Sequence, residues 1–226
     1  MPSVQAETRS SGFLSQRIEW ADRVDKFLQD ALMIWATIDP IGTMAIFAGL
    51  TADLTPEERR KTARRTILYA GGVLIGSIVV GQVILTAMGV RLISFQVGGG
   101  LILFLFGLQM IFGAPTQKLQ EEPHHDIAVF PLAIPGTATP GAILAVILLT
   151  DNHIYPIAEQ LITALVTVGV LGVTWLLMVF SGKILNVIGS GGASILTKIM
   201  GMILAAISVE LVMNAIGVEQ WIDAAP

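Results

Sequence analysis

Six apolar stretches, each long enough to cross a bilayer as a helix, dominate this chain of 226 residues. A hydrocarbon core about 30 Å thick requires roughly 20 apolar residues in helical conformation. Only 13% of the residues are charged, whereas soluble domains carry about 25%. The stretches predict an all-α membrane protein with six transmembrane helices, at Phe27–Leu50, Thr66–Met88, Ile93–Phe112, Ile127–Leu149, Leu161–Phe180 and Ser194–Ile216.

Two of these stretches contain helix-breaking residues near their middles. The first holds the segment Asp39–Gly42, and the fourth holds Pro135–Gly141, which has two prolines and two glycines. Proline removes a backbone hydrogen bond, and in lipid the freed groups must find partners inside the protein or in a cavity. A simple proline kink is the alternative interpretation at both positions.

An N-cap residue followed by proline at the first helical position is a typical helix start. This pair occurs at Thr55-Pro56, Asp39-Pro40 and Thr139-Pro140. Glu58 completes a capping box with Thr55, so we expect the second helix to begin in water. The other two pairs lie inside apolar stretches. We therefore expect helices 1 and 4 to be discontinuous, each with a second half-helix that begins near the bilayer centre.

The two halves of the chain match each other at an offset of 100 or 101 residues. The matched pairs are Pro40 with Pro140, Gly100–Leu103 with Gly201–Leu204, and Gln109 with Glu210. Because each unit has an odd number of spans, the second copy must enter the membrane from the opposite side. Two inverted three-helix repeats with discontinuous helices are a recurring architecture of secondary transporters.

The repeat and the polar segments divide the chain into five parts. In the first part, apolar residues recur at roughly helical spacing among charged ones, which favours an amphipathic helix in the interface; a disordered tail is the alternative. The parts are the interfacial segment at 1–26, a first repeat at 27–113, a polar linker at 114–126, a second repeat at 127–216 and a tail at 217–226.

The distribution of lysine and arginine predicts the orientation. With the N-terminus outside, eight of these residues fall on the inner side and five on the outer side, which fits the excess of positive charge in cytoplasmic loops. We expect a multi-pass protein of the cytoplasmic (inner) membrane with both termini outside. The net charge of −4 gives no reason to expect a nucleic-acid partner. The lipid bilayer is an expected partner, and assembly into a homo-oligomer is an alternative that the sequence leaves open.

Three segments carry a family resemblance, namely Asp39–Gly42, Pro131–Ile143 and Gly201–Ile207. They resemble the MarC family of integral membrane proteins, and the resemblance extends from Ala31 to Gly217. It implies six spans and transport of small neutral amino acids such as glycine and alanine. The sequence departs from the family pattern at Thr43, Ala45 and Glu210, where asparagine, proline and glutamine are usual, and in the run Gly136–Thr139. These departures leave the identity of the substrate open.

The two breaks predict a binding site for a small zwitterionic solute. A helix start exposes unpaired N–H groups and about half a positive charge, so two starts brought together suit a carboxylate. Threonine hydroxyls add hydrogen bonds, glycines leave little room for a bulky side chain, and an aspartate suits an ammonium group. The predicted substrate-binding residues are Asp39, Pro40, Gly42, Thr43, Gly136, Thr137, Thr139 and Gly141.

Two acidic residues lie well inside the predicted spans, Asp39 and Glu210. Carboxylates in a membrane are costly, which favours a functional role, and we expect them to couple transport to a cation or proton. The alternatives are that Asp39 is only an N-cap and that Glu210 only bonds to a neighbouring helix.

The residues do not favour an enzyme. All three histidines lie in predicted loops, and His124-His125-Asp126 is best explained as a solvated loop rather than a metal site. The chain has no H-E-x-x-H and no G-x-S-x-G motif and no cysteine, so we expect no cofactor and no metal. A secondary transporter is the leading interpretation. An exporter or channel for other small metabolites or drugs is the first alternative, and a non-transporting sensor or scaffold is the second.

Overall fold

A computed structural model describes residues 24, 26–113 and 126–218. All regular elements in these ranges are helical. They are a helix at 26–38, α2 (Pro40–Leu50), α3 (Pro56–Ala87), α4 (Leu92–Phe112), the irregular helical segment η1 (Ala128–Thr137), α5 (Pro140–Leu149) and α6 (Ile157–Ile216). Nearly all of the predicted interfacial segment and of the predicted linker, and most of the predicted tail, lie outside the described residues.

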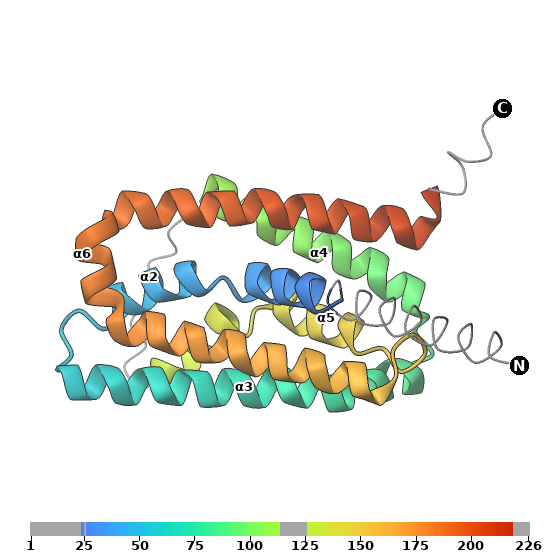
Figure 1. Cartoon of the computed structure of the whole chain (residues 1–226), viewed down its shortest axis with the longest axis horizontal. Helices are drawn as coiled ribbons and strands as arrows, with labels where there is room; N and C mark the ends of the chain where they lie inside the picture. Colours follow the sequence, from blue (N-terminus) through green and yellow to red (C-terminus); the bar gives the residue numbers. More distant parts are fainter. Residues whose placement is uncertain (1–23, 25, 114–125, 219–226) are drawn as a thin grey trace, which may run out of the picture.

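Five helical segments of the described chain are long and apolar enough to cross a membrane: Lys26–Leu50, Pro56–Ala87, Ile93–Phe112, Ile157–Gly189 and Gly191–Ile216. The pair η1 and α5, bent by 54°, makes a sixth if it counts as one span. The predicted all-α fold with about six spans is confirmed at this level. The last two spans form one element, α6, which turns a corner (Figure 1) near Gly189, a residue in a left-handed conformation with φ 68°.

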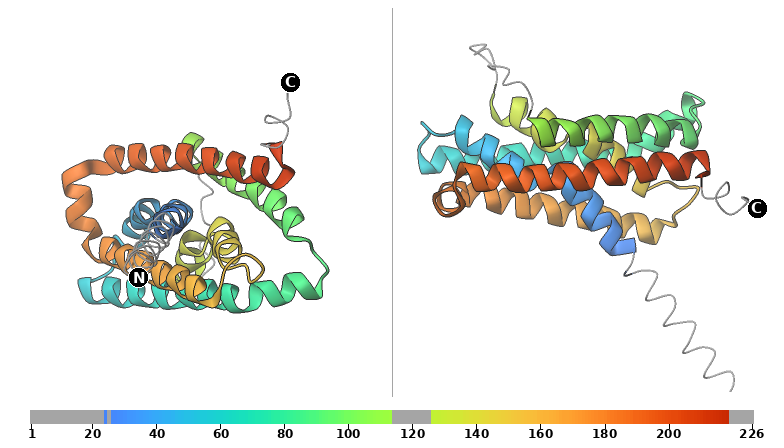
Figure 2. Two further views of the ribbon diagram at one scale, coloured as in Figure 1. Left: turned by 45° about the vertical axis from the view of Figure 1, so that its right-hand side comes forward. Right: turned by 90° about the horizontal axis from the view of Figure 1, so that it is seen from above.

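The interrupted helices lie at the centre of the bundle. The two parts of α6, Ile157–Gly189 and Gly191–Ile216, are called its first and second arms. In both Figure 1 and the left view of Figure 2, helix 26–38, α2, η1 and α5 are enclosed by α3, α4 and these two arms. Burial agrees with this arrangement, because seven of the ten residues of α5 are buried, against six of the 32 residues of α3. The elements that contain the breaks are therefore also the most enclosed.

The start of α3 follows the predicted capping box. Thr55 Oγ1 accepts a hydrogen bond from the Glu58 N–H at 3.3 Å, and a Glu58 carboxylate oxygen accepts one from the Thr55 N–H at 2.9 Å. Pro56 is the first helical residue. This prediction is confirmed, because capping depends only on neighbouring residues.

Helix α4 packs against the second arm of α6 through glycines. A Cβ atom placed on Gly107 would lie 2.8 Å from the Gly201 carbonyl oxygen and 3.0 Å from the Ala205 nitrogen. Small residues that let two backbones approach are typical of helix pairs in membranes. The contact fixes the position of α4 and of the residues that it contributes to the site described below.

We predict that Gly107→Ala destabilises the protein by about 1–3 kcal/mol, the usual cost of inserting a methyl group into a packed contact. The obstructing atoms are backbone atoms, which cannot rotate away. Gly98→Ala is the matched control on the same helix, since nothing lies within 4 Å of a Cβ there. Thermal unfolding in detergent measures both variants. Equal melting temperatures for the two would contradict the packing described.

Candidate functional site

The first interruption consists of a single residue, Asp39, between helix 26–38 and α2. Its backbone is left-handed, with φ 48° and ψ 69°, and its carboxylate Oδ1 accepts a hydrogen bond from the Gly42 N–H at 3.0 Å. The predicted N-cap is therefore present, although N-cap residues usually have an extended backbone. Aspartate is among the few residues that adopt left-handed geometry, so this position suits both its backbone and its side chain.

The second interruption lies between η1 and α5. Thr139 has an extended backbone, precedes Pro140, and accepts a hydrogen bond from the Ala142 N–H at 2.9 Å, as predicted for an N-cap. The segment before it is irregular, because Phe130 and Ile134 leave helical geometry. Both residues precede prolines, which disfavour the helical conformation of the residue before them.

The two interruptions bond directly to each other. The Thr43 hydroxyl donates to the Gly136 carbonyl at 3.0 Å, and the Thr139 hydroxyl donates to the Thr37 carbonyl at 2.9 Å. Each threonine thus provides a partner for a carbonyl at or near the other break, which the membrane interior requires. The Thr137 hydroxyl donates to Leu132 within its own segment at 2.9 Å. All three predicted hydroxyl donors therefore already bond to carbonyls and keep only lone pairs for a ligand.

A cavity of about 900 Å³ lies beside the joined interruptions. Six of the predicted substrate-binding residues line it: Asp39, Gly42, Thr43, Gly136, Thr139 and Gly141. The other two, Pro40 and Thr137, are not among its lining residues. These six residues belong to two segments about 100 positions apart in the sequence, and the fold brings the two segments together at the cavity.

The opposite walls come from helices that the sequence analysis did not assign to the site. One face of α4 contributes Ile102, Leu105, Phe106, Gln109 and Met110, and Gly113 follows the end of this helix. The second arm of α6 contributes Ala193, Ser194, Thr197 and Lys198. The helical spacing of the α4 residues is the one signal that could have revealed this face. The α4 wall is largely apolar.

The charged groups among the described lining residues are Asp39 and Lys198. Asp39 is 7% exposed, whereas Lys198 is exposed and lies on the second arm of α6. The cavity thus presents a carboxylate at the interruption and an ammonium group elsewhere on its wall. Opposite charges in a mostly apolar cavity suit a ligand that carries both signs.

Glu210 lies away from this cavity. It is exposed on α6 and precedes the end of that helix at Ile216 by six residues, which corresponds to about 9 Å along the axis. Its counterpart in the other half, Gln109, does line the cavity. Of the two acidic residues singled out in the sequence, the structure thus places only Asp39 beside the breaks.

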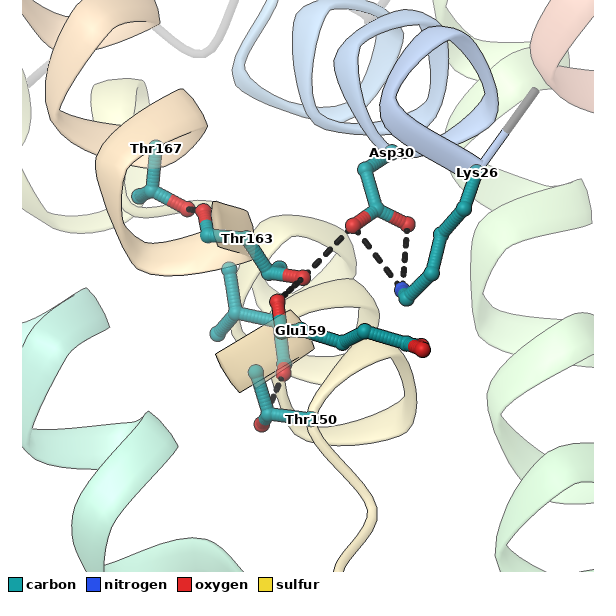
Figure 3. A network of polar contacts seen from close by, with 7 residues as sticks. Lys26, Asp30, Thr150, Glu159, Thr163 and Thr167 are labelled. Carbon is teal, nitrogen blue, oxygen red and sulfur yellow. Dashed lines mark hydrogen bonds and ion pairs between the residues drawn. The ribbon is translucent and has the colours of Figure 1, made fainter. Parts of the chain in front are cut away.

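The structure reveals a second polar cluster, which the sequence analysis missed (Figure 3). Asp30, only 1% exposed, accepts hydrogen bonds from Lys26 Nζ at 3.0 and 3.1 Å and from the Thr163 hydroxyl at 2.5 Å. The Lys26 ammonium also lies 3.9 Å from the centre of the Tyr155 ring. Lys26 and Asp30 are four residues apart, a spacing that favours an ion pair on a helix, and this spacing was the available signal.

Comparison with known proteins gives a consistent result. The model of a family described as MarC family integral membrane protein matches residues 24–220. A UPF0056 membrane protein of Methanocaldococcus jannaschii is 32% identical over 189 residues, covering 81% of this chain and 92% of the relative. The UPF0056 inner membrane protein MarC of Escherichia coli K12 is 27% identical over 198 residues, covering 79% and 88%. No solved structure matches.

We predict that Gly42→Ala disrupts the first interruption. A Cβ atom at Gly42 would overlap the Asp39 carboxylate, which must then move and lose its hydrogen bond to the backbone. Gly49→Ala, on the same helix with nothing within 4 Å, is the matched control. We expect Gly42→Ala to be less stable than this control by about 0.5–2 kcal/mol, the usual value of an N-cap, in thermal unfolding. A result in which both variants unfold alike would show that the cap contributes nothing.

Proposed function

Because this chain belongs to the MarC family of integral membrane proteins, we propose that it is a secondary transporter of small neutral amino acids, of the glycine and alanine kind. It is a multi-pass membrane protein that acts in the cytoplasmic membrane and is not an enzyme. The single observation that carries the proposal is the cavity beside the two joined interruptions, with Asp39 on its wall. Family membership alone does not name a substrate.

The chemistry of the cavity supports a zwitterionic substrate. The helix starts of α2 and α5 reach the cavity at Gly42 and Gly141, and the positive ends of two helices favour a carboxylate. Asp39 supplies the negative charge for the ammonium group of the same molecule. The hydroxyls of Thr43 and Thr139 already donate to carbonyls, and the Gly42 N–H already donates to Asp39. The N–H of Gly141, in the first turn of α5, is therefore the backbone donor that the cavity wall offers to the substrate carboxylate.

The pairing of the interruptions supports alternating access by an inverted repeat. Both α2 and α5 begin with an N-cap followed by proline, and each is bonded to the segment that precedes the other. In transporters of this architecture, two repeats move against each other around a site near the bilayer centre. Because each proposed repeat has three spans, the second repeat is inverted relative to the first.

Coupling to a proton or cation makes the transport secondary. Asp39 is the carboxylate that can contact substrate directly, because it lines the cavity. Glu210 is outside the cavity, so any part that it takes in coupling is exerted at a distance from the substrate. Glu210→Gln is therefore a useful counterpart to Asp39→Asn, since each removes one carboxylate from a membrane-spanning helix.

We predict that the purified protein in liposomes accumulates labelled glycine, alanine or serine under an imposed proton or sodium gradient. Asp39→Asn should weaken substrate binding about 10- to 100-fold, because hydrogen bonds to charged groups contribute about 1.5–3 kcal/mol and 1.4 kcal/mol is tenfold. Glu210→Gln should leave binding unchanged. Absence of accumulation under every gradient would overturn the proposal and favour a channel, an exporter or a non-transporting role.

Stability measurements separate the charge of Asp39 from its role as a cap. Asparagine adopts left-handed geometry and caps helices as well as aspartate, so we expect Asp39→Asn to melt close to the wild type. Asp39→Ala should lose about 1 kcal/mol for the cap alone. If Asp39→Asn unfolds as readily as Asp39→Ala, its transport defect would have to be assigned to misfolding.

A further inference from the structure

The carboxylate of Asp151 stands out among the buried polar groups. Asp151 follows the C-terminal end of α5 and is 0% exposed. Its Oδ1 accepts a hydrogen bond from the His153 N–H at 2.9 Å. Its Oδ2 is buried and has no hydrogen-bond partner among the described residues. A buried carboxylate oxygen without a donor is costly, so a positive charge or a proton is expected at this atom.

The surrounding charges do not compensate Asp151. The Lys26 ammonium gives both of its hydrogen bonds to Asp30 (Figure 3). Tyr155 has a raised pKa, first because it is partly buried and then because Asp30, Glu159 and Asp151 all place negative charge near it. Among the described residues, three carboxylates therefore act on the Tyr155 hydroxyl, and Lys26 is paired with only one of them, Asp30. The exposed side chain of His153 is the remaining titratable group in this loop.

The backbone near Asp151 also favours a cation. Helix α5 ends at Leu149, and the C-terminal end of a helix carries about half a negative charge on its unpaired carbonyls. Thr150 uses one of these carbonyls, that of Val146, at 2.6 Å. Gln82 Nε2 donates to a second one, that of Ile147, at 3.2 Å. The other carbonyls of the last turn add to the negative potential beside Asp151.

A comparison with α2 shows that the turn itself does not need a carboxylate. Thr51 ends α2 with the same side-chain bond, to the Phe47 carbonyl at 2.7 Å. The residue after Thr51 is Ala52, which is exposed, and Asp53 behind it is exposed as well. A buried acid after the helix is therefore particular to α5.

We propose that Asp151 Oδ2 belongs to a binding site for one singly charged cation, either a sodium-type ion or a proton. One buried carboxylate carries one negative charge, which a singly charged cation neutralises. Cation binding is independent of the proposed function. The role of this site in coupling, described next, rests on the proposed function.

Helix α5 connects this cation site to the cavity. Gly141, in its first turn, lines the cavity, and Asp151 follows its last turn, so its ten residues separate the two by about 15 Å. A substrate carboxylate at its start and a cation at its end both act favourably on the same helix dipole. Occupation of the cation site thus stabilises one position of α5 and, with it, one state of the cavity.

Thermal unfolding of the purified full chain in detergent tests the site without substrate. Sodium chloride is compared with choline chloride at equal ionic strength, for the wild type, Asp151→Asn and the control Asp53→Asn. A ligand of the folded state raises Tm by mass action, by about 3–6 °C for each tenfold increase above Kd. We expect this rise in the wild type and Asp53→Asn and its loss in Asp151→Asn.

If a proton occupies the site instead of a sodium ion, infrared spectroscopy identifies it. In that case Tm does not depend on sodium, and the carbonyl band of a protonated carboxyl group is present in the wild type and absent from Asp151→Asn. The proposal is overturned if the wild type shows neither the sodium dependence nor such a band, or if Asp151→Asn keeps whichever of them is found. The wild-type measurements stand even if the variant does not fold.

Liposome assays separate this inference from the proposed function. Loss of sodium- or proton-driven accumulation in Asp151→Asn, with substrate exchange retained, supports the coupling role. Wild-type accumulation by this variant overturns coupling through Asp151, although the protein still transports. If no variant transports at all while the sodium dependence or the carboxyl band persists, the proposed function fails and the cation site stands.

Discussion

The hydrogen bonds between the two interruptions are the interactions on which the rest of the structure depends. A membrane interior offers no water to a broken helix, so each freed carbonyl needs a partner from the protein. Thr43 and Thr139 provide these partners across the centre of the bundle. Because each break needs the other, the helices that contain them must lie together, enclosed by α3, α4 and α6 (Figure 2).

This central pairing explains why a cavity can exist beside it. Asp39 and Thr139 cap the helices that begin at the breaks, so the backbone there is held in place without filling the space around it. The wall from α4 is positioned separately, by the glycine contact with the second arm of α6. The cavity is thus bounded by elements whose positions are fixed by two different kinds of contact.

The buried acidic residues lie in two places, at the centre of the bundle and at one end of it. Asp39 lies at the start of α2, beside the cavity, whereas Asp30 and Asp151 lie near Tyr155 and the start of α6. Lys26 and Thr163 satisfy Asp30 (Figure 3), which joins the first helix to the first arm of α6. Because Lys26 and Asp30 lie on the same helix, the hydrogen bond from Thr163 to Asp30 is the contact that holds the two helices together.

The sequence by itself determined the features that depend on neighbouring residues: an all-helical chain with about six membrane-spanning segments, the capping box at Thr55, and the N-caps at Asp39 and Thr139. It could not determine which side chains meet, because burial depends on segments far away in the chain. Only the tertiary structure placed Gln109 in the cavity and Glu210 outside it, although the two occupy matching positions in the halves. The tertiary structure also buries Asp30 and Asp151. Both lie near helix ends, where a polar residue is common in any sequence and does not by itself indicate burial.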